Sequence, residues 1–267
     1  MKRFESLDEF VEKTKEAQIK KLKNINCFLM PAEVSRLVKE ERLFYCETDN
    51  VLQIVVKHDR YYKSFWYANE YFEFVKMDVS LPIITDIPFS KIMSDKMKYF
   101  EEKILSSGFK LNCSSHRMAL KAEDEVPNDC GEYKIDLFKE EDLENVYNLW
   151  ENSFDVVKNL LYSKNEILSC ENPIYVCKDK EGNFVSAMEL IFSGNYGWVQ
   201  RIAVDKKYRG EGIGSIMEKF YINKCKSLGI TNLLLYTIDG DYVAQSFHKK
   251  FGFLPDGKCN CQYVYRS

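Results

Sequence analysis

The sequence lacks the features that mark membrane-spanning and exported proteins. No apolar run approaches the roughly 18–20 residues that a membrane-spanning helix needs. The N-terminal residues 1–9 are charged, and they contain no apolar core of the kind found in signal peptides. We therefore expect a cytoplasmic protein with no membrane partner. In that compartment its nine cysteines would be reduced thiols rather than disulfides.

The sequence also has no long block of like charge. Its 38 basic and 41 acidic residues give a net charge of −3, and no basic stripe of the kind that nucleic-acid binders use is evident. The pattern Gly-x-x-x-x-Gly-Lys-Ser/Thr is absent, which disfavours an ATP-binding loop. Cys259 and Cys261 have no second pair nearby, so we expect no metal site and interpret them as alternate residues of a terminal strand.

At 267 residues the chain is long enough for two small domains. Residues 121–131 are polar and contain a proline and a glycine, which is typical of a domain boundary. We expect an N-terminal α/β domain over residues 1–125 and a second domain over residues 132–267. Both halves contain a helix pattern followed by Gly-Phe and a strand, which favours an internal repeat.

Periodicity predicts the elements of each half. For the first half it predicts helices over residues 7–24, 32–41 and 91–107, and strands over 43–46, 52–56, 63–67, 72–75, 81–84 and 115–120. For the second half it predicts helices over residues 141–154, 157–170, 215–228 and 242–251, and strands over 133–137, 174–177, 184–192, 198–204, 233–238 and 262–265.

The most informative segment follows the strand that ends at Val204. It contains Arg209-x-x-Gly212-x-Gly214 and opens directly into a predicted helix. Glycines let a ligand approach the backbone, and the unpaired N–H groups and dipole of a helix start attract anions. The segment therefore predicts a phosphate or pyrophosphate site. The alternative is a tight strand-to-helix turn with solvated basic residues.

Two ordered segments carry a family resemblance. Residues 199–214 resemble the fourth strand and pyrophosphate loop of the GNAT superfamily of acyl-CoA N-acyltransferases, and residues 244–253 resemble that family's Ala-x-x-Leu-Tyr-x-Lys-x-Gly-Phe helix end. The resemblance implies an α/β (α+β) GNAT fold, a mixed and mostly antiparallel central sheet flanked by helices. The repeat suggests that this domain stands in tandem with a degenerate GNAT-like first half.

The resemblance also implies an activity. The chain would be an N-acetyltransferase that uses acetyl-CoA as co-substrate and no metal, and the primary amine would attack directly in a ternary complex. The acceptor would be a small-molecule or peptide amine, and a homodimer is a possible assembly. The alternative is a non-catalytic acyl-CoA-binding sensor or interaction protein.

The family's cofactor contacts carry over to the strand end and the glycine loop, together with the start of the following helix. The expected cofactor-binding residues are Ile202, Ala203, Val204, Arg209, Gly210, Glu211, Gly212, Ile213, Gly214, Ser215 and Asp241. Backbone groups of Ile202 and Val204 would pair with pantetheine. Asp241 replaces an asparagine that is frequent in the family, and its other role would be a helix N-cap.

Two residues are candidates for catalysis. His248 stands where the family often carries a tyrosine that protonates the CoA thiolate; a histidine suits proton transfer, and the alternative is a surface residue. Glu189 is the only acid in the strand over 184–192 and would be the base that deprotonates the amine. Its alternative is a solvent-facing position, with Gln200 orienting the substrate instead.

The first half has no second Arg-x-x-Gly-x-Gly pattern. Residues 85–91 are its apparent counterpart to the loop, and they contain Pro88 where free amides would be needed. We therefore expect no CoA site in the first half, which would instead wall the acceptor site or contact another subunit.

Overall fold

The computed structural model describes residues 1–74, 79–121, 126–127 and 130–266. The chain divides into two compact units: Met1–Ser114 with Lys258–Ser267, and Ser115–Gly257. It passes from the first unit to the second within strand β7 (Lys110–Lys121) and returns within β13 (Leu254–Tyr265). The linker predicted over residues 121–131 lies partly outside the described residues, and the domain bounds of 125 and 132 stay a prediction.

The first unit is a sheet with helices on both faces. Its helices are α1 (Leu7–Ile19), α2 (Pro31–Lys39) and α3 (Asp95–Ser106). Its strands are β1 (Lys2–Arg3), β2 (Lys23–Asn24), β3 (Leu43–Glu47), β4 (Val51–Lys57), β5 (Tyr62–Ala68) and β6 (Ile83–Ser90), with the first part of β7 and the last part of β13. In strand order the unit reads β1-β3-β4-β5-β6-β13, and β5 and β6 form a parallel pair.

The second unit repeats this plan with one more helix. Its strands are β8 (Lys134–Leu137), β9 (Ile174–Lys178), β10 (Phe184–Ser193), β11 (Tyr196–Val204) and β12 (Asn232–Ile238). Its helices are α4 (Leu143–Ser153), α5 (Lys164–Leu168), α6 (Ile213–Ser227) and α7 (Tyr242–Lys249), with short 3-10 turns at Glu140–Asp142 and Lys206–Tyr208. The order of its strands is β7-β12-β11-β10-β9-β8, and only β11 and β12 run parallel among these pairs.

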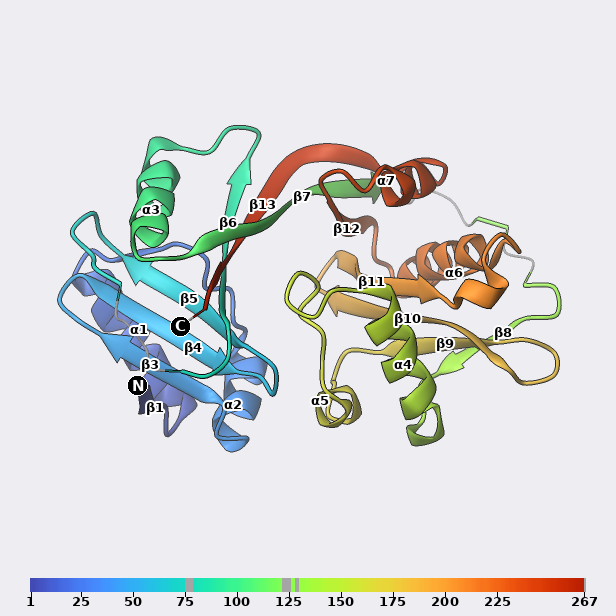
Figure 1. The fold of residues 1–267 in the computed structure, drawn as a ribbon, viewed down its shortest axis with the longest axis horizontal. Helices are drawn as coiled ribbons and strands as arrows, with labels where there is room; N and C mark the ends of the chain where they lie inside the picture. Colours follow the sequence, from blue (N-terminus) through green and yellow to red (C-terminus); the bar gives the residue numbers. More distant parts are fainter. Residues whose placement is uncertain (75–78, 122–125, 128–129, 267) are drawn as a thin grey trace. The chain divides into compact units, whose positions relative to one another are not determined.

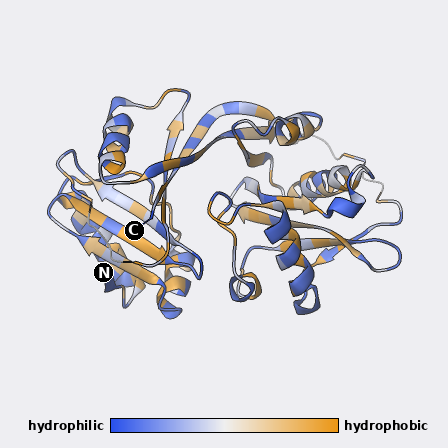
Figure 2. Cartoon of the chain, in the orientation of Figure 1, coloured by the Kyte–Doolittle hydropathy of each residue, from blue (hydrophilic) through white to orange (hydrophobic). Residues whose placement is uncertain are grey.

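The sheet of the second unit separates two hydrophobic cores. On one face α6 packs with Met217, Tyr221 and Cys225 against β10 to β12. On the other face α4 packs with Val146 and Trp150. The central strands are apolar along most of their length, as expected for strands covered on both faces, and Figure 2 shows their hydrophobic colouring against the more hydrophilic helices. Figure 1 shows α4 and α6 beside the sheet.

The two units share one order of elements. Two helices precede three antiparallel strands, the third of which is parallel to the next strand; a helix and a final strand follow. In the second unit α6 connects β11 to β12, whereas in the first unit residues 69–82 connect β5 to β6, and those of them that are described contain no helix. The mixed, mostly antiparallel sheet and the tandem arrangement predicted from the sequence are thus confirmed.

Several local predictions were wrong. Residues 72–74 are not a strand, and residue 75 lies outside the described residues. Residues 85–91 are not the counterpart of the glycine loop, because they belong largely to strand β6, which extends to Ser90. Pro88 is paired with Asn260 of β13 within that strand. The counterpart by topology is the β5–β6 connection.

The helix predicted over residues 157–170 is also much shorter than expected. Only Lys164–Leu168 is helical, and it begins with a capping box in which Ser163 and Glu166 bond to each other's backbone N–H groups, at 3.2 and 3.0 Å. Before it, the Asp155 carboxylate accepts from the N–H of Val157 and forms a separate turn. The Ser-x-x-Glu signature is present in the sequence and marks this start.

Among the described residues, no helix is long and apolar enough to cross a membrane.

Candidate functional site

The site begins where the parallel pair of the second unit opens. The ladder between β11 and β12 ends at Val199 and Leu235, although both strands continue. At the same level the register of β10 against β11 shifts, so that Gln200 is an extra residue between Val199 and Arg201. Such a bulge bends its strand and increases its twist. Beyond this point β11 and β12 are no longer paired with each other. We call the opening between residues 200–204 of β11 and 236–238 of β12 the second fork, because it lies in the second unit.

The glycine loop lies at the mouth of this fork. The Asp205 carboxylate accepts from the N–H of Lys207 at 2.9 Å and starts the turn. Gly210 and Gly212 have φ angles of 91° and 84°, which other residues adopt only with strain. Helix α6 starts at Ile213 directly after Gly212. The positive end of a 15-residue helix and its unpaired N–H groups thus lie at the fork.

The fork and the loop line a cleft of about 600 Å³. Its lining residues are Ser153, Phe154, Ile202, Ala203, Val204, Tyr208, Arg209, Gly210, Gly212, Ile213, Gly214, Ser215, Asp241, Val243, Ala244, Phe247, His248 and Lys250. All predicted cofactor-binding residues are among them except Glu211. The Glu211 carboxylate instead accepts from the Tyr133 hydroxyl at 2.9 Å, and this bond raises the pKa of Tyr133.

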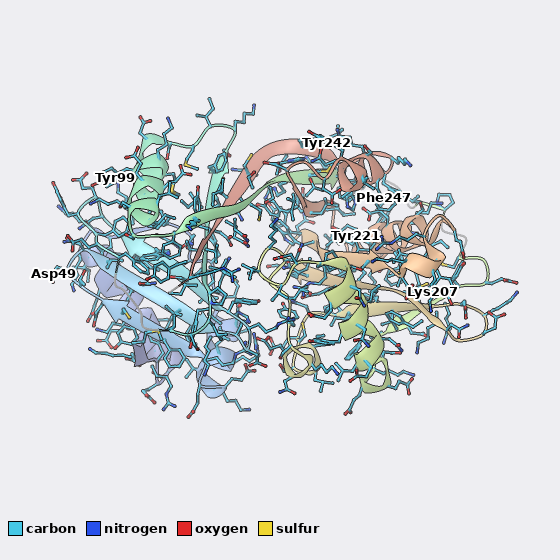
Figure 3. All side chains as sticks on the ribbon, in the orientation of Figure 1. Asp49, Tyr99, Lys207, Tyr221, Tyr242 and Phe247 are labelled. Carbon is cyan, nitrogen blue, oxygen red and sulfur yellow. The ribbon has the colours of Figure 1, made fainter. Side chains whose placement is uncertain are left out.

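Helix α7 forms the opposite wall of the cleft. Asp241 caps it by accepting from the N–H of Ala244 at 2.9 Å, so the N-cap interpretation is confirmed, and Asp241 also lines the cleft. A Cβ on Gly214 would lie 3.4 Å from the Phe247 ring, so the start of α6 and α7 pack within van der Waals distance here. Figure 3 labels Tyr242 and Phe247 on this helix.

The basic residues of the loop differ in their positions. Arg209 lines the cleft, and its Nε donates to the Val204 carbonyl at 3.1 Å. Lys250 adds a second positive charge from the end of α7. Lys206 and Lys207 are exposed and do not line the cleft. The positive charge of the cleft therefore comes from Arg209, Lys250 and the start of α6.

His248 is held by a buried carboxylate. Its ring lies in the cleft wall with only 6% of the residue exposed, so the surface alternative is wrong. Its Nδ1 is 3.1 Å from Oε1 of Glu218 on α6, and Glu218 is fully buried. Phe247 and Phe253 contact the ring edge-on, at centroid distances of 5.1 and 6.0 Å. The imidazole is therefore fixed on three sides.

Glu189 is also fully buried, so its solvent-facing alternative is wrong. Its Oε2 is 3.0 Å from Nε of Arg201, the neighbouring residue on β11. Its Oε1 accepts from the Tyr162 hydroxyl at 3.3 Å and from the Asn172 amide at 3.0 Å. The guanidinium of Arg201 in turn lies over the rings of Tyr162 and Trp150, at 4.4 and 4.9 Å. Neither member of the ion pair lines the cleft.

Sequence reasoning missed Glu218 and Arg201. A signal existed for Glu218, because Tyr221, Ile222 and Cys225 follow it at spacings of three, four and seven residues, which places it on the buried face of α6. An acid on an apolar helix face requires a partner.

Among the described residues, no group of three or more His, Cys, Asp or Glu is placed to hold a metal ion.

The first unit contains an equivalent fork that is filled. The ladder between β5 and β6 ends at Ser64 and Thr85, and β2 then pairs with the free edge of β5 through Lys23–Ala68 and Asn24–Tyr67. The N–H of Ile25 donates to the Trp66 carbonyl at 2.9 Å. We call this arrangement the first fork.

Asn26 closes the first fork with its side chain. Its amide donates to the Asp86 carbonyl at 2.8 Å and to Thr85 Oγ1 at 3.0 Å, and its Oδ1 accepts from the Trp66 N–H at 2.8 Å. A single buried side chain therefore links β5 to β6 where the two strands part.

Residues 143–253 match the model of the Acetyltransferase (GNAT) family. A protein of Bacillus subtilis (strain 168), named as a candidate ribosomal protein bS18-alanine N-acetyltransferase, is 28% identical over 121 residues, which are 44% of this chain and 78% of that protein. The family match contains the fork, the glycine loop and α7.

Solved structures resemble a larger part of the chain. The GCN5-related N-acetyltransferase from Sphaerobacter thermophilus has a TM-score of 0.57 at 11% identity, covering 89% of this chain and 85% of that one. The tandem GNAT protein from the clavulanic acid biosynthesis pathway has a TM-score of 0.57 at 8% identity, covering 80% and 78%. At these identities the likeness shows the fold, and it extends to the first half.

Proposed function

We propose that this chain, whose second half belongs to the GNAT acetyltransferase family, is an N-acetyltransferase that moves the acetyl group of acetyl-CoA to a primary amine. The observation that carries the proposal is the open second fork, which leads directly to the glycine loop and the start of α6. The relative's name refers to an alanine amine, which supports an amine acceptor. Small-molecule and peptide amines both fit this proposal.

In the proposed complex the CoA diphosphate binds at the glycine loop. The N–H groups of the loop and of the first turn of α6 would donate to its oxygens, and Arg209 would add charge. The pantetheine arm would pair with the free edge of β11 at Ile202 and Val204, as an added strand pairs with a sheet edge. The outward turn of Glu211 supports this placement, because it removes a negative charge from the diphosphate site.

Direct attack of the amine is favoured over a covalent acyl-cysteine. Cys170 is the thiol that contacts the polar cluster of Glu189, with its Sγ 3.8 Å from Oε1. Burial, and then the neighbouring Glu189 carboxylate, raise the pKa of the Cys170 thiol to about 12. Because the thiolate is the nucleophilic form, this thiol is a poor nucleophile near neutral pH. The acetyl group would therefore pass to the amine within one ternary complex.

Two residues would move the protons of the reaction. His248 would protonate the CoA sulfur, since it lines the cleft and its ring is fixed. Glu189 would accept the proton of the amine through the half-buried Tyr162 hydroxyl, which donates to its Oε1. Neither Glu189 nor Tyr162 lines the cleft, so a bridging water would carry the proton from the amine to the Tyr162 hydroxyl.

We further propose that the first unit binds no CoA. The filling of the first fork by Lys23–Asn24, Ile25 and Asn26 supports this, because the edge that would pair with pantetheine is already paired. The physical reason for the missing CoA site would therefore be this paired edge, and not Pro88, on which the sequence-based expectation rested. The chain would hold one CoA molecule.

Titration calorimetry with acetyl-CoA tests the cofactor site. The chain offers a matched pair of variants, because Gly212 and Gly182 both have a φ of +84° and neither has an atom within 4 Å of an added Cβ. Gly212→Glu and Gly182→Glu therefore introduce the same strain and the same charge, one in the cleft and one in the β9–β10 turn. We expect Gly212→Glu to abolish measurable binding and Gly182→Glu to bind as the wild type does. Equal binding by both variants would reject the loop as the diphosphate site.

Turnover tests the chemistry. The wild-type chain is incubated with acetyl-CoA and a panel of amines that includes diamines, amino acids and peptides with a free N-terminus, and free thiol is measured. We expect amine-dependent thiol release that Gly212→Glu lacks. Tight binding of acetyl-CoA without release for any amine would favour the acyl-CoA sensor instead.

A further inference from the structure

The pair of Glu218 and His248 is unusual for its burial. Glu218 lies on the core face of α6 among Met217, Tyr221 and Ile222, and its side chain is fully buried. Its Oε1 contacts His248 Nδ1 at 3.1 Å, whereas its Oε2 is buried without a hydrogen-bond partner among the described residues. A carboxylate in such surroundings requires a compensating charge. In the described part of the chain, only the imidazole of His248 supplies one in direct contact.

The contact restricts the protonation states of the pair. An ionised carboxylate can only accept, so Nδ1 must carry a proton when Glu218 is charged. If Glu218 instead carries the proton and donates it to Nδ1, the neutral ring carries its own proton on Nε2. When Glu218 and His248 together hold two protons, Nε2 carries an N–H in both arrangements. Nε2 is the ring nitrogen that Glu218 does not contact.

The remaining charges near the ring are more exposed. Arg209, Asp241 and Lys250 line the same cleft from the glycine loop and the two ends of α7, and all three are exposed residues. Phe247 and Phe253 supply the other contacts of the ring, and both are uncharged. Water screens exposed charges, whereas a buried carboxylate at contact distance acts in a low dielectric. Glu218 therefore dominates the electrostatic environment of His248.

We propose that Glu218 is a positioning residue that orients the His248 ring and holds its Nδ1 proton, so that Nε2 is the nitrogen available for proton transfer in acetyl transfer. This proposal rests on the proposed function. When the C–S bond of the tetrahedral intermediate breaks, its electron pair goes to sulfur, and the proton on Nε2 moves to that sulfur. The imidazole is left neutral, with Nδ1–H still donated to the Glu218 carboxylate. A proton from solvent restores the imidazolium before the next turnover.

The first test is Glu218→Gln, which keeps the shape of the side chain and removes its charge. We expect the acetyl-CoA dissociation constant to change less than about twofold, because Glu218 does not line the cleft. We expect kcat to fall at least about tenfold, which is less than the roughly 10²–10⁴-fold that a general acid contributes, because the imidazole itself remains. An unchanged kcat in Glu218→Gln would overturn the proposal.

The second test asks whether Glu218 acts through His248. In the His248→Gln background, Glu218→Gln should cause no further loss of kcat, because the residue that it positions is gone. A residue that only stabilises the fold would instead lower activity by the same factor in both backgrounds. Additive losses would therefore contradict a positioning role.

A third measurement needs no turnover. The chain has three histidines, His58, His116 and His248, so long-range proton–nitrogen NMR spectra of the wild type can be assigned with His248→Gln. We expect the neutral His248 ring to carry its proton on Nδ1 in the wild type, and to lose this preference in Glu218→Ala, which has no acceptor there. A neutral wild-type His248 ring that carries its proton on Nε2 would overturn the proposal even if the enzyme binds acetyl-CoA normally. Conversely, failure of acetyl-CoA binding would reject the proposed function and leave this result standing.

Discussion

The ion pair between Glu189 and Arg201 allows a test that separates structural from catalytic roles. The perturbations are Glu189→Gln, Arg201→Met and their combination. Each single variant leaves one charge of the pair without its partner, in a place where both side chains are nearly inaccessible, at 0% and 3% exposure. In Glu189→Gln the amide oxygen can still accept from Tyr162 and Asn172, so the neighbouring donors keep an acceptor.

The expected magnitudes follow from this burial. Removing one partner of a buried pair typically costs about 3–5 kcal/mol, because the other charge stays buried without its counter-charge. In a domain of this size each kcal/mol lowers Tm by about 2–4 °C, so each single variant should melt roughly 6–20 °C lower. The double variant removes both charges of the pair, and methionine can fill the space over the Trp150 ring. It should regain most of the lost stability, to within about 1.5 kcal/mol of the wild type.

The assay combines urea unfolding with steady-state kinetics on the double variant. If Glu189 is the base, kcat of this folded variant should fall about 10²–10⁴-fold while acetyl-CoA binding is retained. Wild-type kcat in the double variant would refute Glu189 as the base and leave it a structural residue. Single variants that each lose less than about 1 kcal/mol would refute the buried-pair reasoning itself.

Two further predictions concern packing and the first fork. Asn26→Ala should destabilise the chain by about 1–3 kcal/mol, because it leaves the Trp66 N–H without its acceptor. Calorimetry on this variant should still give one CoA per chain at an unchanged dissociation constant. Two equivalent CoA sites in the wild type would contradict the filled first fork. Gly197→Ala should cost about 1–3 kcal/mol in urea unfolding, because its Cβ would press against Cys225 Sγ. Adding Cys225→Ala should recover part of that loss, and a second loss of equal size would argue against this contact.

The second half was more predictable than the first for a physical reason. Strand β11, the glycine loop and α7 are consecutive in the sequence, and each carries a local signal: alternation, glycines at a helix start, and an aspartate cap. The fork itself depends on a bulge at Gln200, whose register is set by the pairing of β10 with β11 and has no local signature.

The partners of the candidate catalytic residues depend on long-range packing. Glu218 and His248 are 30 residues apart and meet because α6 and α7 lie together, and Glu189 meets Asn172 across 17 residues. The counterpart of the glycine loop in the first unit was mispredicted, because the described part of the β5–β6 connection contains no helix and Pro88 belongs to the next strand. A sequence pattern can place residues on an element, but it cannot say which element covers them.

The two forks of this chain indicate why a splayed parallel pair alone does not make a cofactor site. Strands that part leave backbone groups that must be paired when they are buried. The first fork pairs them internally, through β2 and the Asn26 side chain. The edge of the second fork borders a cleft instead, so its groups can be paired by water or by a ligand.

An open strand edge binds a cofactor such as CoA only when an anion site lies beside it. In the second unit the glycine loop and the start of α6 supply that site, and in the first unit the described part of the β5–β6 connection contains no helix that could do so. Without a diphosphate to anchor it, a pantetheine arm would lose more freedom on ordering than a few backbone bonds return. Where no helix start supplies an anion site, pairing the open strand edge with another segment of the same chain stabilises the protein more than an open edge does. In the first unit this segment is β2 (Lys23–Asn24) together with Asn26.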